Sequence, residues 1–116
     1  MTVYRRGDIV LVNFNPHKRA EEIAKVRPAV IVSDTDLNAI LDLVSVVALT
    51  TNLIDDAAPL RIRLTPREHL QHPSDAMVEQ LRTVAKSRIG QRIASVSAEE
   101  MRRIEEGMRL MLGMKL

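Results

Sequence analysis

The sequence contains no cysteine and no tryptophan, and Tyr4 and Phe14 are its only tyrosine and phenylalanine. Without cysteine there is no disulfide framework, no thiol nucleophile and no thiolate ligand for a metal. With so few aromatic rings, a base-stacking platform like that of RNA-recognition motifs has almost nothing to build with. Any contact with a nucleic acid must therefore depend on charge and on hydrogen bonds.

Glycine, histidine and long apolar runs are also scarce. The four glycines form no phosphate-binding loop and no Gly-x-Ser-x-Gly elbow, which sets aside nucleotide-binding folds and serine hydrolases. The three histidines lack the spacing of metal ligands, so we expect no metal and no cofactor. No apolar run approaches the roughly 20 residues that cross a bilayer, and no leader pattern opens the chain. We therefore expect a cytoplasmic protein without membrane contact.

The length and the charge distribution narrow the class further. A chain of 116 residues with 46% hydrophobic and 28% charged side chains is typical of one globular domain, here residues 1–116. The net charge is only +2, but residues 34–58 hold no lysine or arginine and lie between two basic segments. This pattern suits an anionic partner if the fold joins the basic segments. A solvated surface of mixed charge is the alternative.

The pattern of apolar residues indicates mostly strands. β-rich runs predict strands at 9–14, 29–32, 43–50, 61–64, 76–83 and 92–96. A cap residue, a proline and a glutamate at Thr65, Pro66 and Glu68 predict a short helix to about Leu70, and residues 84–89 a helical turn.

The chain ends in an amphipathic helix. Ser97 and Glu100 form a capping box, and apolar residues then recur at spacings of three and four, which predicts a helix over 98–112. Several short strands with a terminal helix favour a mainly β fold with helices (α+β), built as a small β-barrel.

The side chains suited to chemistry are basic, acidic and hydroxyl groups at expected strand ends and on one loop. They are Arg27, Thr50, Glu79 and Arg82, with Glu22 and Lys25 on the loop. Such a set suffices for metal-free RNA cleavage, because the nucleophile is the 2′-OH of the substrate and the protein need only move protons and stabilise the phosphorane. From the residues alone, the favoured interpretation is structural: a rim salt bridge between Arg27 and Glu79, with Thr50 capping a strand.

Four ordered motifs resemble one family. They are Arg-Gly-Asp-Ile-Val-Leu-Val-Asn-Phe-Asn-Pro at 6–16, Ala-Glu-Glu-Ile-Ala-Lys-Val-Arg-Pro-Ala-Val-Ile-Val-Ser at 20–33, Val-Ala-Leu-Thr-Thr at 47–51 and Met-Val-Glu-Gln-Leu-Arg-Thr-Val-Ala-Lys-Ser-Arg-Ile at 77–89. In this order, and followed by the capped helix, they resemble the MazF/PemK family of toxin endoribonucleases. The similarity covers nearly the whole chain.

The resemblance implies an SH3-like β-barrel with short helices and a C-terminal amphipathic helix, and a homodimer. It also implies the toxin of a type II toxin-antitoxin system, which a cognate antitoxin protein neutralises. The implied activity is sequence-selective cleavage of single-stranded mRNA without metal or cofactor. Attack by the 2′-OH would leave 2′,3′-cyclic phosphate and 5′-OH ends.

The motif positions assign roles by resemblance. Arg27 and Thr50 correspond to active-site residues of the family, and Glu79 corresponds to an acid that serves as general base in some members. The residues expected to bind or position RNA are Glu22, Lys25, Thr51, Asn52 and Arg82.

Three positions depart from the family pattern. Ala20 replaces a loop glycine, Ala85 replaces a frequent aspartate, and Met77 stands where some members use an arginine as the acid, which leaves that role to Arg27 or Arg82. A non-catalytic reading therefore stays open. The chain would then be an SH3-like binding module, either a gyrase poison of the CcdB type or an inactive relative that retains antitoxin binding.

Overall fold

The computed structural model describes residues 2–14 and 26–115. The strands are β1 (Asp8–Asn13), β2 (Val26–Ile31), β3 (Leu43–Thr50), β4 (Arg61–Leu64), β5 (Ser74–Met77), β6 (Arg82–Ala85) and β7 (Ile89–Ser95). The helices are α1 (Thr35–Ile40) and α2 (Ala98–Met111), and two single 3₁₀ turns are η1 (Val78–Gln80) and η2 (Lys86–Arg88).

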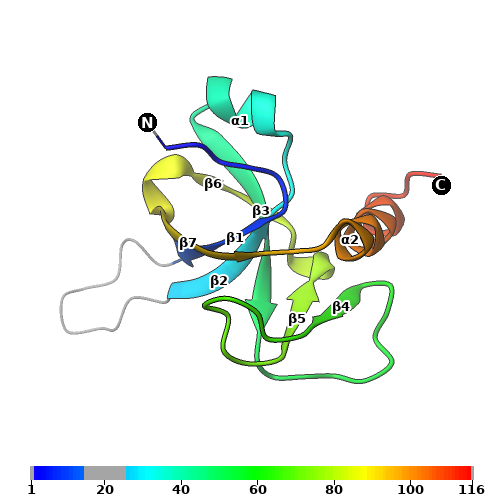
Figure 1. Ribbon diagram of the computed structural model, residues 1–116. Helices are drawn as coiled ribbons and strands as arrows, with labels where there is room; N and C mark the ends of the chain where they lie inside the picture. The colour runs from blue at the N-terminus through cyan, green and yellow to red at the C-terminus, as the bar shows by residue number, and fades with distance from the viewer. Residues whose placement is uncertain (1, 15–25, 116) are drawn as a thin grey trace.

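The strands form one curved antiparallel sheet (Figure 1). Its order is β4-β5-β3-β2-β1-β7, and β6 pairs with the first half of β3 while β5 pairs with its last two residues. The expectation of a mainly β fold with helices is confirmed. Among the described strands the path ends at β4 and β7, so these pairings form an open sheet and do not by themselves establish a closed barrel.

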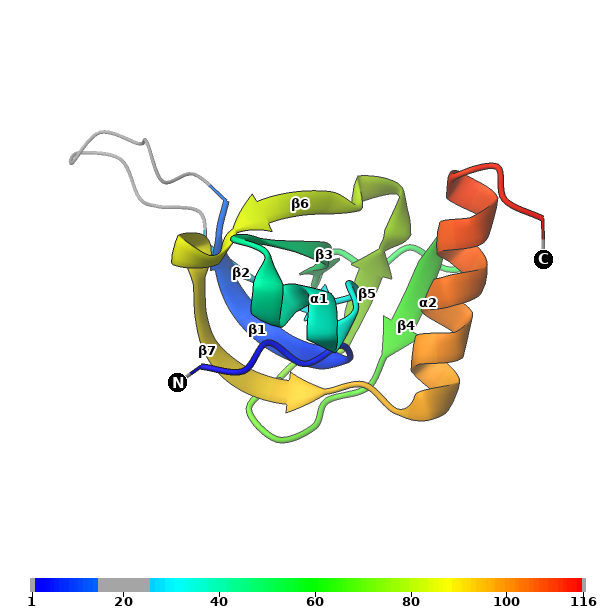
Figure 2. The same ribbon diagram turned by 90° about the horizontal axis from the view of Figure 1, so that it is seen from above.

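Alternating side chains place buried residues on both faces of the sheet. Along β2, Val30 joins one apolar cluster while Ala29 and Ile31 join the other. Helix α2 covers the first cluster with Met101 and Ile104 and packs against β4 and η1 (Figure 2).

The helix approaches the chain closely at Gly107. A Cβ at this position would lie 2.3 Å from the carbonyl oxygen of Pro59 and 3.3 Å from the side chain of Val78 in η1. Only glycine therefore permits this approach without a shift of the helix or of the backbone beneath it.

Several sequence predictions agree closely with the structure. Strands β3 and β4 have the predicted bounds, and α2 begins at the predicted capping box, in which Ser97 and Glu100 exchange hydrogen bonds of 3.1 and 2.8 Å. Gly113 follows the helix with a φ of 69°, a backbone conformation that glycine commonly supplies after the end of a helix.

Two predictions are wrong. The expected helix from Pro66 to Leu70 is a turn, because Arg67 and Leu70 form a bridge, Glu68 has a φ of 44° and the Arg67 guanidinium binds Glu100. The expected strand 76–83 is broken by η1, since the chain leaves β5 and then joins β6 on another part of β3.

Helix α1 was not predicted. Its cap is Asp34, whose carboxylate accepts the amides of Asp36 and Leu37 at 3.1 Å. Neither helix among the described residues has the length and the apolar character needed to span a membrane.

Candidate active site

Arg27 and Thr50 lie on neighbouring strands and on the same face of the sheet. The pairing of β2 with β3 aligns Ala29 with Ala48, and continuing this register by two residues places Arg27 opposite Thr50. Side chains directly opposite in an antiparallel pair point the same way, with Cβ atoms roughly 5 Å apart. The structure therefore brings together the two residues that the sequence placed at separate strand ends.

Both side chains have polar atoms that are available to a ligand. Among the described residues, the half-buried Arg27 guanidinium has no hydrogen-bond or ion-pair partner. The Thr50 hydroxyl accepts the amide N–H of Asn52 at 3.1 Å. This bond uses a lone pair and leaves the hydroxyl hydrogen to donate, so the pair offers a cation and a neutral donor side by side.

On the other side of Thr50, the next two strands carry an ion pair in the same row of the sheet. Asp75 in β5 pairs with Thr50 and with Arg63 of β4, and its carboxylate accepts Arg63 Nε at 2.5 Å and the amide of Ile54 at 2.9 Å. Burial by itself raises the pKa of Asp75. The hydrogen bonds from Arg63 and from the amide of Ile54 lower this pKa by more than burial raises it, so the net pKa is below its usual value. Arg63 is thus engaged by Asp75, whereas Arg27 is not.

Glu79 lies in η1, directly after β5, and its carboxylate is held by Arg61. Oε1 accepts Nε of Arg61 and forms an ion pair with its terminal nitrogen, both at 2.8 Å. The other carboxylate oxygen is buried and has no partner among the described residues. No hydrogen bond or ion pair in this part of the chain joins Glu79 to Arg27 or to Thr50. Glu79 follows β5, the strand that pairs with the end of β3, but its carboxylate is bound to Arg61 and not to Arg27.

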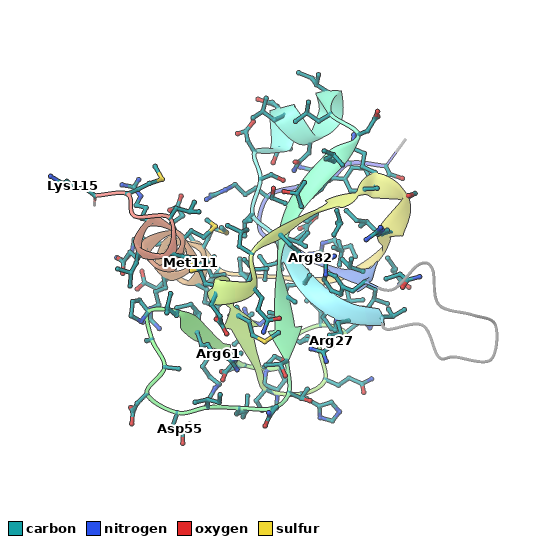
Figure 3. The ribbon with its side chains drawn as sticks, turned by 180° about the vertical axis from the view of Figure 1, so that it is seen from behind. Arg27, Asp55, Arg61, Arg82, Met111 and Lys115 are labelled. Carbon is teal, nitrogen blue, oxygen red and sulfur yellow. The ribbon has the colours of Figure 1, made fainter. Side chains whose placement is uncertain are left out.

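Met77 is buried in β5, with 3% of its surface exposed. It pairs with Arg61 in the sheet, and the register places it beside Ala48, one row from Thr50. Figure 3 shows Arg27 and Arg61 on opposite sides of the end of β3. Three strand spacings of about 4.8 Å separate their strands, which is roughly 14 Å across the sheet, and Arg61 lies one row away from Arg27 along the strands.

Arg82 lies further up the same face. It pairs with Val46, and its guanidinium stacks on the ring of Phe14 at 5.0 Å from the centroid. A second cation, Lys86, covers the ring of Tyr4 at 5.2 Å. Each of these two rings is therefore partnered by a cation, and Arg82 presents an exposed guanidinium plane.

The remaining predicted residues divide into two groups. Thr51 and Asn52 are exposed and directly follow Thr50. Glu22 and Lys25, together with the loop position Ala20, lie outside the described residues. Ala85 is half-buried in β6 opposite Leu43.

Sequence reasoning missed a pocket of about 290 Å³ beside Thr50. Its lining residues are Leu11, Pro28, Leu49, Thr50, Thr51, His69, Leu70, Gln71, His72, Ser74 and Ile93. The sequence predicts a short helix to about Leu70 and assigns no role to the residues from Gln71 to Ser74. The one feature of the sequence that could have indicated the pocket is the cluster of polar residues between two predicted strands: His69, Gln71, His72 and Ser74.

The described residues contain no group of three or more histidine or acidic side chains arranged to hold a metal ion. The arrangement instead concentrates nitrogen and hydroxyl donors at the shared end of β2 and β3. Such donors can bind a phosphate and stabilise charge that develops on its oxygens.

Solved structures share this fold. The MazE-MazF complex (Form-II) of Deinococcus radiodurans matches with a TM-score of 0.81 and 20% identity over 99% of this chain and 100% of the matched chain. Toxin MazF-mt6 of Mycobacterium tuberculosis matches with a TM-score of 0.78 and 16% identity, covering 94% of this chain and 99% of that one. An endoribonuclease in complex with its cognate antitoxin from Mycobacterial species matches at 0.74 and 21%, over 100% and 99%.

These likenesses define the class of fold, a MazF-like antiparallel sheet with a C-terminal helix. The family model described as "PemK-like, MazF-like toxin of type II toxin-antitoxin system" matches residues 5–112. The chain therefore belongs to the PemK/MazF toxin family, as its motifs indicated.

Proposed function

We propose that this protein is a metal-independent endoribonuclease, the toxin of a type II toxin-antitoxin system, which cleaves single-stranded mRNA at selected sequences. The observation that supports it best is the register of β2 with β3, which pairs Ala29 with Ala48 and, continued by two residues, sets Arg27 opposite Thr50 on one face of the sheet. A fixed, always-charged guanidinium beside a hydroxyl donor suits the oxygens of a phosphodiester. Membership of the family supports the same activity.

In this proposal the reaction needs no external nucleophile. The 2′-oxygen attacks the adjacent phosphorus and loses its proton to Glu79, while Arg27 and Thr50 stabilise the phosphorane oxygens. The bond from phosphorus to the 5′-oxygen breaks, and the leaving oxygen takes a proton from Arg27. The products are a 2′,3′-cyclic phosphate and a 5′-hydroxyl, and Glu79 must part from Arg61 to serve as the base.

Four further proposals follow from the family. The chain folds as a single domain, residues 1–116, and its curved sheet is a variant of the SH3-like barrel. The active form is a homodimer in the cytoplasm, where mRNA is found. A cognate antitoxin binds and neutralises it; in support, one structural relative is an endoribonuclease in complex with its cognate antitoxin and another is a MazE-MazF complex. Glu22, Lys25, Thr51, Asn52 and Arg82 contact or position the RNA.

The proposal is tested by incubating the purified protein with single-stranded RNA in excess EDTA. We expect cleavage to persist, because the nucleophile and every proposed donor belong to the RNA or to the protein. Fragments should accept phosphate from a polynucleotide kinase without prior dephosphorylation, because their 5′ ends are hydroxyls. Double-stranded RNA and DNA of the same sequence are the controls and should stay intact.

Two results would contradict the proposal. Intact RNA at protein concentrations equal to the substrate would favour the non-catalytic binding module. Cleavage that stops in EDTA and returns with a divalent cation would show a metal-dependent reaction instead.

A further inference from the structure

We propose that the pocket beside Thr50 binds one nucleobase of the RNA and selects it through its edge, with Gln71 and His72 as specificity-determining residues. This inference rests on the proposed ribonuclease function and assigns part of its substrate recognition. The pocket touches the site directly, because Thr50 lines it and Pro28 follows Arg27 in β2.

The lining of the pocket matches the chemistry of a base. Apolar and polar residues both line it: the apolar ones are Leu11, Pro28, Leu49, Leu70 and Ile93, and the polar ones are Thr50, Thr51, His69, Gln71, His72 and Ser74. A nucleobase likewise has apolar faces and a polar edge. At about 290 Å³ the pocket lies at the lower end of small-molecule sites, which suits a single base.

No acidic side chain lines this pocket, and none lines the adjoining hollow of about 330 Å³, which shares Thr51 and His72 with it. A hollow of about 510 Å³ near β4 differs from both, because it is lined by three aspartates and three arginines: Asp55, Asp56, Asp75, Arg61, Arg63 and Arg103. Arg63 in that hollow is already bound to Asp75, whereas the two joined hollows beside Thr50 can accept consecutive nucleotides without a carboxylate in their lining.

The polar rim is held in place by the backbone. The amide of His69 donates to the carbonyl of Ile93 at 3.0 Å, and the Ser74 hydroxyl donates to the carbonyl of His72, also at 3.0 Å. The side chains of His69, Gln71 and His72 are exposed above these contacts. The rim is thus positioned before the ligand binds, with imidazole and amide groups free to form hydrogen bonds.

The test is an NMR titration of the histidine rings with a 2′-O-methylated single-stranded oligonucleotide, which cannot be cleaved by this chemistry. The chain has only three histidines, so the rings are readily assigned. We expect saturable shifts of His69 and His72 that an abasic oligonucleotide of equal length and charge does not produce. Because the probe is not cleaved, these shifts are independent of whether the protein is a nuclease.

Variants separate base recognition from phosphate binding. Gln71→Ala and His72→Ala should each weaken binding of the preferred oligonucleotide about tenfold, the factor that corresponds to one lost hydrogen bond of about 1.4 kcal/mol, and leave binding of the abasic strand unchanged. Gln91→Ala is the matched control, since Gln91 is exposed on β7 and lines neither hollow.

Three results would overturn the inference. The rings could shift equally with the abasic strand, which would mean phosphate contact only. They could stay unchanged while the oligonucleotide binds elsewhere. They could respond to a short peptide of leucine and tryptophan but not to RNA, which would assign the pocket to a protein partner. Absence of cleavage together with base-dependent shifts would instead contradict the nuclease proposal and retain the base site.

Discussion

Arg27→Ala is expected to lower the rate of RNA cleavage by at least about 10²- to 10³-fold, the usual cost of losing one charge-stabilising donor. The register of β2 with β3, continued from Ala29 and Ala48, sets Arg27 opposite Thr50, and the Arg27 guanidinium has no partner among the described residues. Alanine removes the proposed phosphate contact and the proposed proton donor together. Cleavage rates on one RNA under single-turnover conditions measure the effect, and circular dichroism checks that the fold is kept.

Two companion variants sharpen this prediction. Arg27→Lys keeps the charge but loses the fork of donors, so we expect it to restore only part of the activity. Arg102→Ala is the matched control, because Arg102 is exposed on α2 and bound to Glu99 and Glu106. Full activity of Arg27→Ala would remove this residue from the site.

Glu79→Gln is expected to lower the rate by about 10²- to 10⁴-fold, which is the usual contribution of a general base. Glutamine keeps the shape of the side chain but cannot take the proton of the 2′-OH. This variant is a stringent test of the base assignment, because among the described residues the Glu79 carboxylate is bound to Arg61 and not to Arg27 or Thr50.

Arg61→Met separates a base from a structural ion pair. If Glu79 serves as the base, Arg61→Met should lower the free energy of unfolding but retain cleavage, whereas Glu79→Gln loses it. If the pair is only structural, both variants should cost similar stability and both should cleave RNA at the rate of the unaltered protein. Retained cleavage in Glu79→Gln would therefore reject the base assignment and leave the other roles in place.

The sequence predicted the strand ends that hold Arg27 and Thr50, because both residues border runs rich in β-branched side chains. Arg27 comes shortly before one run, and Thr50 ends another. β3 was predicted to the residue, since eight uncharged residues leave little ambiguity about a buried strand. The proximity of the two side chains, in contrast, depends on the register between β2 and β3, which no single strand pattern encodes.

The surroundings of Glu79 could not be predicted from the pattern of apolar residues, for a related reason. β3 exchanges neighbours along its length, pairing with β6 over Leu43–Val46 and with β5 over Leu49–Thr50. The chain between those two partners must leave the sheet, which produces η1. Local alternation of apolar residues does not reveal such an exchange, so residues 76–83 resembled one strand. The pocket at His69 and His72 was missed because it forms only when a turn meets residues of five strands.

The most direct test of the account is a crystal structure with a 2′-O-methylated single-stranded RNA that carries the preferred cleavage sequence. The account predicts that the scissile phosphate lies within hydrogen-bond distance of the Arg27 guanidinium and the Thr50 hydroxyl, with the attacking 2′-oxygen turned towards Glu79. A phosphate bound at another face of the sheet, with Arg27 and Thr50 left without contact to RNA, would contradict it.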